Sequence, residues 1–341
     1  MENKILFQIR RKSIGKNSVD KILELINPVI IKNVQVKSIT CPYTNEGIIN
    51  KLRNIIWMSK YRNEYVHFAG DLGYLSIFRK RKSYLITILD LGMPGKYTGF
   101  KKFILDHIWY KQAVRRSFKS IAISEFTKRS ICELFSHPNN IETKIQTIGC
   151  PVNLSLESAE KDLRFPIDQN SKLKVLQIAT SQHNKNISNS ISALIGKNVE
   201  YHFVGLLKKE DEILLKKNFI NYQVYRNISE ELLRCLYKTC HLLLFPSLYE
   251  GFGMPIIEAQ AHNCLVLTSN ISPMKEVAGD GAILVNPYSI DSISKGIDQI
   301  LSLPEIQEKL REKGKKNSRK YTPEIIGGMY IKEYKRFLNG K

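Results

Sequence analysis

Several features of common protein classes are missing from this sequence. Its 341 residues contain no apolar run of about 18 residues, so we predict no transmembrane helix. The opening residues, MENKILFQIRRK, carry an acid at the second position and charges after a short apolar stretch, which argues against a signal peptide. Repeats and low-complexity segments are also absent. A globular chain remains, and its length predicts two domains of ordinary size.

Cysteines are few and are not arranged in pairs. The six cysteines are scattered, and none forms a Cys-x-x-Cys motif. This pattern argues against a metal site and against a disulfide framework. Reduced thiols are typical of the cytosol, so we expect a cytoplasmic protein.

Acidic residues are scarce relative to basic ones. There are 32 Asp and Glu against 52 Lys and Arg, a formal net charge of +20. Residues 1–155 hold 26 of the basic residues but only 11 of the acidic ones. An excess concentrated in one half predicts an anionic partner there: a nucleic acid, a phosphate-bearing substrate or an acidic membrane surface. A general lysine bias of the source proteome is the alternative.

Short apolar runs alternate with helical patterns along the whole chain. Such alternation predicts parallel α/β sheets, here two doubly wound Rossmann-like domains in tandem. Ligands of these sheets bind outside the carboxyl ends of the strands, which in a two-domain protein predicts a cleft between the domains. The predicted strands are 4–9, 34–39, 64–70, 84–89, 120–124, 174–179, 199–205, 222–227, 241–247, 265–270 and 282–287.

The predicted domain boundaries follow from a polar, proline-containing stretch at 162–173, which we interpret as a linker. Residues 1–160 form the N-terminal domain, which we expect to bind the acceptor. Residues 172–315 form the C-terminal domain, which we expect to bind a nucleotide. The segment 316–341 is predicted to be a helix that packs back toward the N-terminal domain.

One stretch carries the strongest functional signal: FPSLYEGFGMPIIEA, residues 245–259. Pro255 suits the first position of a helix, where its missing N–H has no cost. Gly251 and Gly253 allow close approach of a ligand to the backbone. A helix start binds anions, and carboxylates accept hydrogen bonds from sugar hydroxyls. With Glu250 in the loop and Glu258 in the first helical turn, the stretch predicts a site for a phosphorylated, hydroxyl-rich ligand.

This stretch and its surroundings resemble the Glu-x7-Glu signature of the retaining nucleotide-sugar glycosyltransferases of family 4, which have the GT-B fold. The resemblance extends to SEELLRCLYKTCHLLLFPS before the signature, ISPMKEVAGDGAILVNP after it, and LQIATSQHNKNISNSISAL and ISEFTKRSI earlier in the chain. It is strongest from about residue 174 to 290 and weak over the first 80 residues. The chain resembles bacterial mannosyltransferase-like enzymes of polysaccharide and lipopolysaccharide synthesis.

The resemblance implies roles for individual residues of the C-terminal domain. Glu250 would contact the hydroxyls of the transferred sugar, and Glu258 those of the ribose. Lys185 would stabilise the leaving diphosphate. The backbone around the two glycines would also bind the donor, through Gly251, Phe252, Gly253 and Met254. The loop 224–229, which contains Asn227, would hold the base. The arrangement implies no metal or other cofactor, and no Asp-x-Asp motif occurs.

Two departures from the family pattern concern the same site. The family often has an arginine five residues before the lysine, where this chain has Thr180, a donor-binding candidate without charge. The acceptor domain often has His-Asp at the strand end that here reads Leu89-Asp90. We retain Asp90 as a catalytic candidate.

Three further residues could be functional or structural. His67 lies near a strand end and could enter the cleft, although a lone histidine is more often structural. Ser124 and Thr127 could take part in catalysis, but serine and threonine favour helix N-caps, and we predict capping.

The basic first half offers a surface for a membrane. Residues 96–119 mix aromatic and basic residues, with Phe100, Phe103, Ile104, Ile108 and Lys111 at helical spacing. Together with the run Arg79–Lys82 they could rest on an anionic bilayer, at the inner face of the plasma membrane. A core-packed helix with a solvated basic face is the alternative.

The sequence therefore predicts a retaining transferase that moves a sugar from a nucleoside diphosphate to a hydroxyl of a glycan or lipid-linked acceptor. Retention could use a covalent intermediate on a carboxylate or front-face attack. A GT-B epimerase or phosphorylase is an alternative. A nucleic-acid-binding protein is a further one, although no nucleic-acid module is recognisable, so we expect no nucleic-acid partner.

Overall fold

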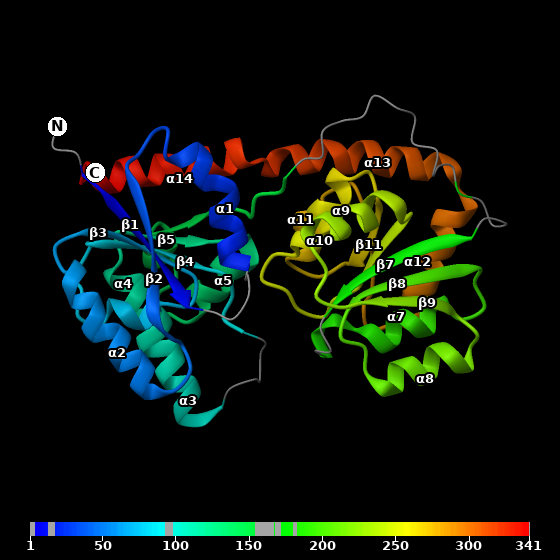
Figure 1. Ribbon diagram of the computed structural model, residues 1–341, viewed down its shortest axis with the longest axis horizontal. Helices are drawn as coiled ribbons and strands as arrows, with labels where there is room; N and C mark the ends of the chain where they lie inside the picture. The colour runs from blue at the N-terminus through cyan, green and yellow to red at the C-terminus, as the bar shows by residue number, and fades with distance from the viewer. Residues whose placement is uncertain are drawn as a thin grey trace. The chain divides into compact units, whose positions relative to one another are not determined.

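The computed structural model describes residues 4–12, 18–92, 98–153, 167, 172–179 and 183–340. They form two compact units, each built on a six-stranded parallel sheet (Figure 1). Unit 1 contains residues 1–151 and 323–341, and unit 2 contains residues 152–322. Most of the predicted linker lies outside the described residues.

The sheet of unit 1 has the strand order β2-β1-β3-β4-β5-β6, with every neighbouring pair parallel. β3 and β4 are apolar along most of their length and almost fully buried, as expected for central strands covered on both faces. The strands are β1 (Leu6–Lys12), β2 (Val36–Thr44), β3 (Tyr65–Ala69), β4 (Tyr84–Ile88), β5 (Lys119–Ala122) and β6 (Ile145–Thr147).

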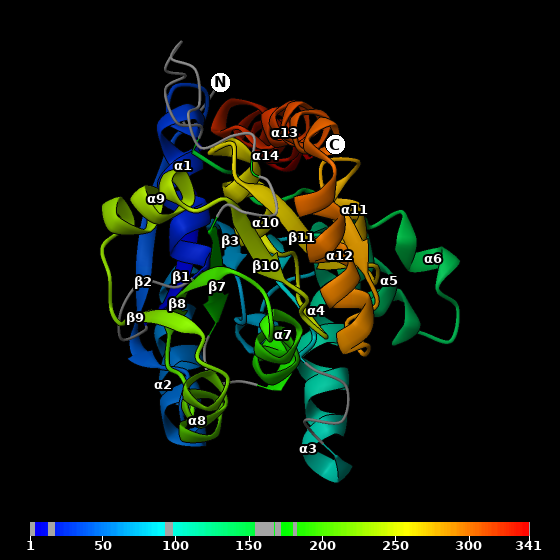
Figure 2. The same cartoon turned by 90° about the vertical axis from the view of Figure 1, so that its right-hand side faces the viewer.

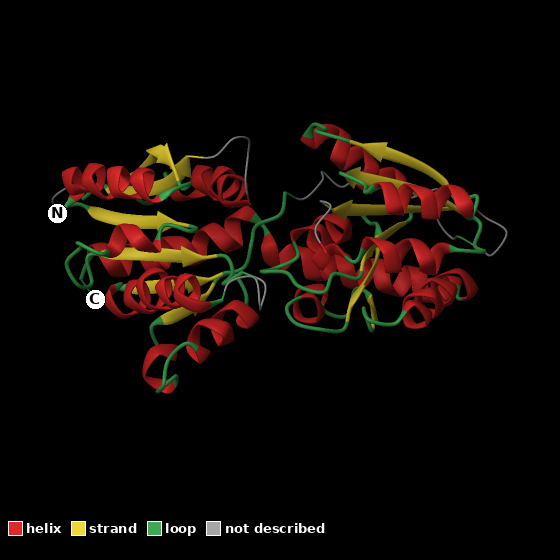
Figure 3. Ribbon diagram, turned by 90° about the horizontal axis from the view of Figure 1, so that it is seen from below, coloured by secondary structure: helices red, strands yellow, loops and turns green. Residues whose placement is uncertain are grey.

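Helices cover both faces of this sheet, as Figures 1 and 3 show. α1 packs against α14, the last helix of the chain, while α2 packs with β2 and with residues 73–76 and places Lys51 over the ring of Trp109. The helices are α1 (Ser18–Ile30), α2 (Ile48–Met58), α3 (Gly99–Ile104), α4 (Ala113–Arg116), α5 (Glu125–Glu133), α6 (Asn139–Glu142) and α14 (Pro323–Leu338), with 3-10 turns at Ser59–Tyr61 and Gly73–Ser76.

α14 docks on unit 1 through buried aromatic side chains. Tyr330, Tyr334 and Phe337 are buried on the face that it turns to the unit. The Tyr334 hydroxyl accepts a hydrogen bond from Gln8 Nε2 at 3.1 Å and lies 2.8 Å from Nδ1 of His67. Within the segment 316–341, α13 ends at Ser318 and only α14 belongs to unit 1.

His67 lies in the core, which agrees with the structural role expected of a lone histidine and not with the alternative of a residue that enters a cleft. Its side chain is fully buried in β3 beneath α14, between the hydroxyls of Tyr334 and Thr87, each 2.8 Å from a ring nitrogen. Burial lowers the pKa of His67 to about 3 from its ordinary value of 6.5. The imidazole is therefore neutral at physiological pH.

A pH dependence of stability follows from His67. Because its pKa is lower in the folded state, the unfolded state binds the proton first, and the free energy of unfolding of unit 1 should fall as the pH drops below 6.5. The expected slope is about 1.4 kcal/mol per pH unit between pH 6 and pH 4. Urea titrations followed by tryptophan fluorescence report on unit 1, because Trp57 and Trp109, the two tryptophans of the chain, both belong to it. His67→Gln should flatten this slope, and an unchanged slope would show that other groups cause it.

Two predictions about the basic surface were wrong. The helical stretch 99–116 does not keep α-helical spacing, because residues Leu105–Gln112 form a π-helix, whose hydrogen bonds span five residues. Arg79 is not a surface cation: it is buried, and its guanidinium donates to the backbone carbonyls of Tyr61, Glu64 and Ser83. The side chain of Phe100, another residue of the predicted basic surface, is not among those that the structure describes.

The sheet of unit 2 has the order β12-β11-β10-β7-β8-β9, again parallel throughout. α7, α8 and α12 lie on one face, and α10, α11 and α13 on the other (Figure 2). The strands are β7 (Leu173–Ala179), β8 (Val199–Gly205), β9 (Asn221–Tyr225), β10 (Leu242–Phe245), β11 (Leu265–Ser269) and β12 (Ile283–Val285); the helices are α7 (Ile187–Leu194), α8 (Lys209–Lys217), α9 (Glu230–Thr239), α10 (Met254–Ala261), α11 (Met274–Ala278), α12 (Ile290–Ser302) and α13 (Pro304–Ser318).

The strand order fixes where a ligand can bind to unit 2. From β7 the chain winds outward through β8 and β9, and from β10 it winds the other way through β11 and β12. β7 and β10 are therefore the neighbours at which the winding reverses, and the crevice outside their carboxyl ends is where doubly wound sheets bind ligands. The segments that follow these two strands contain Lys185 and Glu250.

Candidate functional site

The loop after β10, residues 246–253, is called the glutamate loop here because it contains Glu250. It ends at Gly253, whose φ of +100° lies in the left-handed region that favours glycine. α10 begins at the next residue, Met254, so Pro255 occupies the second position of the helix. No side chain caps this start among the described residues, which leaves it suited to an anionic ligand.

Phe252 and Gly251 have different surroundings within the glutamate loop. Phe252 is buried, and its ring contacts that of Tyr321 edge-on at 5.6 Å, so only its backbone could bind a ligand. Gly251 is half-buried. The predicted use of backbone groups rather than side chains at this loop fits these positions.

Lys185 and Glu250 meet directly. Nζ of Lys185 lies 2.6 Å from Oε1 of Glu250, and both side chains are largely shielded, with 19% and 14% of their surfaces exposed. The ammonium also lies 5.3 Å from the centre of the Phe245 ring. The cation predicted to bind a diphosphate and the carboxylate predicted to bind a sugar thus form one charged pair at the point where the winding reverses.

Two asparagines that sequence reasoning missed hold this pair in place. The side-chain amide of Asn184 donates to the carbonyl of Tyr249 at 3.0 Å, and the backbone carbonyl of Asn184 accepts from the backbone N–H of Leu248 at 2.8 Å. The amide of Asn186 donates to the carbonyls of Pro246 and Pro287 at 3.0 and 2.7 Å. Their position on either side of Lys185 is the only signal in the sequence. Through them the turn that carries the lysine is fixed to the glutamate loop.

Glu258 was predicted in the first turn of α10, and this was wrong. It lies in the second turn and is buried. Its Oε2 accepts a hydrogen bond of 2.8 Å from the hydroxyl of Tyr237 in α9. The Tyr237 ring stacks on that of His262, whose Nδ1 lies 2.8 Å from the Glu258 carbonyl. The pKa of Tyr237 is raised, mainly by burial and secondly by the Glu258 carboxylate. The phenol therefore stays protonated and donates its hydrogen bond to the carboxylate.

Tyr237 is expected to position Glu258 for its predicted contact with ribose. Tyr237→Phe removes the hydroxyl and leaves the stacked ring, so the carboxylate loses one restraint. Loss of one hydrogen bond to a charged group should raise the KM for the donor about tenfold and change kcat little. Steady-state kinetics with varied donor concentration would measure this. A fall in kcat at unchanged KM would contradict the positioning role.

The remaining donor-binding candidates are less closely placed. Asn227 follows β9, is exposed and has a φ of +51°. Thr180 lies outside the described residues. A cavity of about 260 Å³ opens at the start of α7; neither glutamate lines it. Its lining residues are His183, Asn186, Ile187, Ser188, Asn189, Lys208, Asp211, Leu248 and Tyr288.

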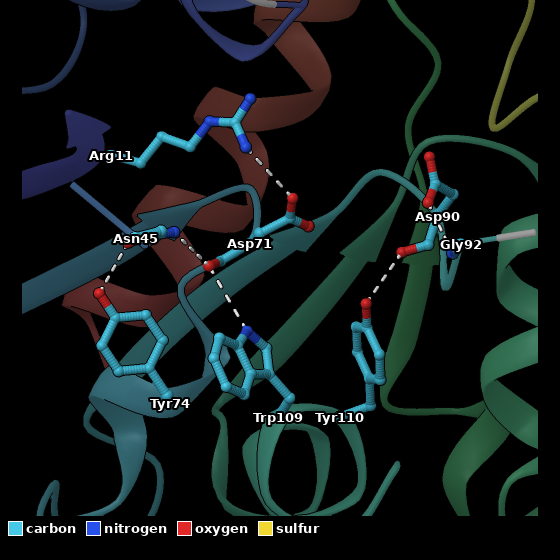
Figure 4. A network of polar contacts seen from close by, with 8 residues as sticks. All are labelled: Arg11, Asn45, Asp71, Tyr74, Asp90, Gly92, Trp109 and Tyr110. Carbon is cyan, nitrogen blue, oxygen red and sulfur yellow. Dashed lines mark hydrogen bonds and ion pairs between the residues drawn. The ribbon is translucent and has the colours of Figure 1, made fainter. Parts of the chain in front are cut away.

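The carboxyl edge of the sheet in unit 1 carries a second polar network, shown in Figure 4. Oδ1 of Asp90 accepts a hydrogen bond of 2.7 Å from the N–H of Gly92, and the Asp90 carbonyl accepts one of 3.4 Å from Tyr110. The predicted candidate Asp90 thus closes its own turn, two residues after β4. The structure places Asp90 in unit 1 and the glutamate loop in unit 2.

Asp71, which the sequence analysis did not select, stands at the equivalent place after β3. Its carboxylate lies 3.5 Å from the Arg11 guanidinium, and both side chains are partly exposed. Its carbonyl accepts hydrogen bonds from Asn45 and Trp109 at 3.1 and 3.5 Å (Figure 4). The signal available in the sequence was position alone: an aspartate two residues beyond a buried strand, like Asp90.

The predicted capping role is confirmed for Ser124 but not for Thr127, which lies inside α5. Ser124 is the N-cap of α5, and its hydroxyl accepts a hydrogen bond of 3.0 Å from the backbone N–H of Thr127. The Thr127 hydroxyl donates to the Leu89 carbonyl at 3.0 Å, which ties α5 to the turn that contains Asp90.

The described residues contain no group of three or more His, Cys, Asp or Glu side chains arranged to hold a metal ion. Among the same residues, no helix combines the length and the apolar character needed to cross a bilayer.

The sequence resembles known proteins over most of its length. Residues 159–317 match the family described as Glycosyl transferases group 1. The O-antigen chain mannosyltransferase B of Escherichia coli is 27% identical over 234 residues, which are 63% of this chain. The chain spans only 60% of the length of that relative.

Solved structures match the fold of the whole chain. A glycosyltransferase from Rickettsia africae has a TM-score of 0.75 at 17% identity, covering 100% of both chains. HepE of Anabaena, solved in complex with UDP and glucose, has a TM-score of 0.76 at 12% identity, covering 97% of this chain and 99% of its own. At these identities the likeness establishes the fold alone. The protein therefore has the GT-B fold, with a C-terminal unit that matches the Glycosyl transferases group 1 family.

Proposed function

We propose that this protein is a retaining hexosyltransferase of family 4. It transfers a sugar from a nucleoside diphosphate to a hydroxyl of a glycan or lipid-linked acceptor in cell-surface polysaccharide synthesis. The observation that carries the proposal is the contact of Lys185 with Glu250 at the winding reversal of unit 2. Mannose is the first candidate for the sugar, because the E. coli relative is described as a mannosyltransferase.

In the proposed reaction, the bond between the anomeric carbon and the diphosphate breaks and a bond to the acceptor oxygen forms on the same face. The acceptor proton passes to the leaving phosphate oxygen, so charge and atoms balance without a protein base. Lys185 stabilises the negative charge that develops on the leaving group, which lowers the transition state rather than the ground state. Glu250 accepts hydrogen bonds from the sugar hydroxyls, and Glu258 from the ribose.

The Lys185–Glu250 pair gives the site a defined charge state before the donor binds. The two charges compensate each other where little water reaches them. An arriving diphosphate offers Lys185 a more highly charged partner, which leaves the Glu250 carboxylate available to the sugar. Lys208, which lines the adjoining cavity, is a candidate for the positive charge that the family places at Thr180.

We further infer that the reaction needs no metal ion and takes place in the cytoplasm, at the inner face of the plasma membrane. Lys185 takes the part that a divalent cation would play at the leaving group. Full activity after dialysis against EDTA is expected. Activity that is lost with EDTA and restored by Mg²⁺ or Mn²⁺ would overturn the metal-free mechanism.

A donor screen tests the proposed function. The full chain is incubated with GDP-mannose, UDP-glucose, UDP-galactose or UDP-N-acetylglucosamine, with and without a bacterial lipid extract, and products are identified by mass spectrometry and NMR. We expect transfer from one of these donors, and we expect the new glycosidic bond to keep the axial anomeric configuration of the donor. Epimerised nucleotide sugar without transfer would identify an epimerase, and an inverted linkage would contradict retention.

A further inference from the structure

The first clue to another function is the exposed face of α2 in unit 1. Four aliphatic side chains on this helix are exposed: Ile48 by 75%, Ile49 by 67%, Leu52 by 53% and Ile56 by 71%. We call these four residues the α2 stripe. Asn54 and Met58 of the same helix are buried, so α2 is attached to the unit by its other face.

The α2 stripe is continuous rather than a set of scattered residues. Ile48, Leu52 and Ile56 follow each other at intervals of four, which places them one above the other along the helix, with Ile49 beside them. Figures 1 and 2 show α2 at the outside of unit 1. Single exposed aliphatic residues are normal on a protein surface, whereas a contiguous stripe marks an interaction site.

Basic residues outnumber acidic ones around the stripe. From residue 46 to residue 64 the basic residues are Lys51, Arg53, Lys60 and Arg62, and the acidic ones are Glu46 and Glu64 at the two ends. Lys51 lies 5.1 Å from the centre of the Trp109 ring, and Arg53 lies 5.4 Å from that of Tyr43. Lys60 and Arg62 are exposed just beyond the end of α2.

A second exposed segment adjoins the end of α2. Phe78 is 76% exposed and is followed by the exposed run Lys80–Lys82. Arg79, between them, is buried and donates to the carbonyls of Tyr61 and Glu64. The buried arginine therefore holds this basic segment beside the end of α2, although it is not itself part of the surface.

We propose that the α2 stripe and the basic residues around it dock the protein on an anionic lipid bilayer. Aliphatic side chains enter the boundary between head groups and acyl chains, and basic side chains contact the anionic head groups. A glycan offers little to aliphatic isoleucine and leucine. A second copy of the same face would bring like charges together, in a chain whose net charge is +20. An anionic bilayer is complementary both to the exposed aliphatic side chains and to the basic residues around them.

The proposal is tested by co-sedimentation of the full chain with vesicles. One set contains about 30% phosphatidylglycerol in phosphatidylcholine, and the other phosphatidylcholine alone. Wild-type protein is expected to bind the anionic vesicles, with weaker binding at 0.5 M salt because the electrostatic part is screened. The triple variant Ile48→Ser/Leu52→Ser/Ile56→Ser should bind at least about tenfold more weakly, because it loses three aliphatic contacts. The assay requires no catalysis, so its outcome is independent of the proposed transfer.

Ile213→Ser supplies the matched control, since Ile213 is 64% exposed on α8 in unit 2. It should bind vesicles like the wild type, and all variants should keep the wild-type circular dichroism, because the substituted side chains are exposed. Equal binding to both kinds of vesicle, or wild-type binding by the triple variant, would overturn the proposal. So would a wild-type dimer, measured by light scattering, that the triple variant converts to a monomer.

Discussion

Replacing Glu250 by glutamine should lower kcat/KM for sugar transfer by about 100-fold. The substitution keeps the size of the side chain but removes the charge that strengthens its hydrogen bonds to sugar hydroxyls, and charge-assisted bonds are about twice as strong as neutral ones. It also removes the negative partner of Lys185, 2.6 Å away. Free Lys185 then attracts the diphosphate more strongly. We therefore expect the loss mainly in kcat, with the KM for the donor unchanged or lower.

Glu212→Gln is the matched control for this experiment. It removes one negative charge from the same unit, on α8, at a residue without a predicted role. The control should retain the kcat/KM and the unfolding temperature of the wild type, and circular dichroism should show that Glu250→Gln is folded at the assay temperature. Full transferase activity in Glu250→Gln would mean that the carboxylate does not act on the sugar.

Replacing Gly205 by alanine should destabilise unit 2 by about 3 kcal/mol or more. Gly205 ends β8 with a φ of +138°, and a Cβ atom there would lie 1.6 Å from the carbonyl oxygen of Ala179, at the end of β7. Neither strand end can yield easily, because the two pair along their whole length. The backbone would have to move at the edge of the sheet where the proposed donor site lies.

Gly328→Ala tests whether this cost is specific to the position. Gly328 lies in α14, and a Cβ atom there meets nothing within 4 Å. Alanine is the better helix former, so this control should be neutral or stabilising by up to about 1 kcal/mol. Hydrogen exchange followed by mass spectrometry would locate the loss of protection, which we expect in β7 and β8 for Gly205→Ala. Wild-type protection in those strands would contradict the steric argument.

The alternation of strands and helices could be predicted from the sequence because the central strands are buried on both faces. Eleven runs were assigned, and each corresponds to an observed strand with ends shifted by a few residues. β6 was missed because it has three residues, of which only Ile145 is buried. A short edge strand has too little apolar pattern to be recognised.

The proposed site was predictable only in part. Gly253 and Pro255 signalled a turn and a helix start locally, since their backbone preferences are properties of the residues themselves. The contact of Lys185 with Glu250 depends on which strands are neighbours, and that is decided by the winding of the whole unit. For the same reason the position of Tyr237 beside Glu258 could not be predicted.

Burial of charge was the other feature that local pattern could not predict. The run Arg79–Lys82 has the composition of a basic surface, yet Arg79 satisfies three backbone carbonyls inside unit 1. Its role depends on carbonyl groups that the fold brings together from residues 61 to 83. The exposure of the α2 stripe could not be predicted from the sequence either, because apolar residues at helical spacing ordinarily predict a buried helix face.

Equilibrium binding of nucleoside diphosphates tests the central claim most directly, since it requires neither the sugar nor the acceptor to be known. Isothermal titration of UDP and of GDP into the full chain should show one site for at least one of them. Glu258→Gln should weaken that binding about tenfold, through loss of the charged contacts to ribose, whereas Glu212→Gln should leave it unchanged. Absence of binding by both nucleotides, or equal affinity in wild type and Glu258→Gln, would contradict a nucleotide-sugar site in unit 2.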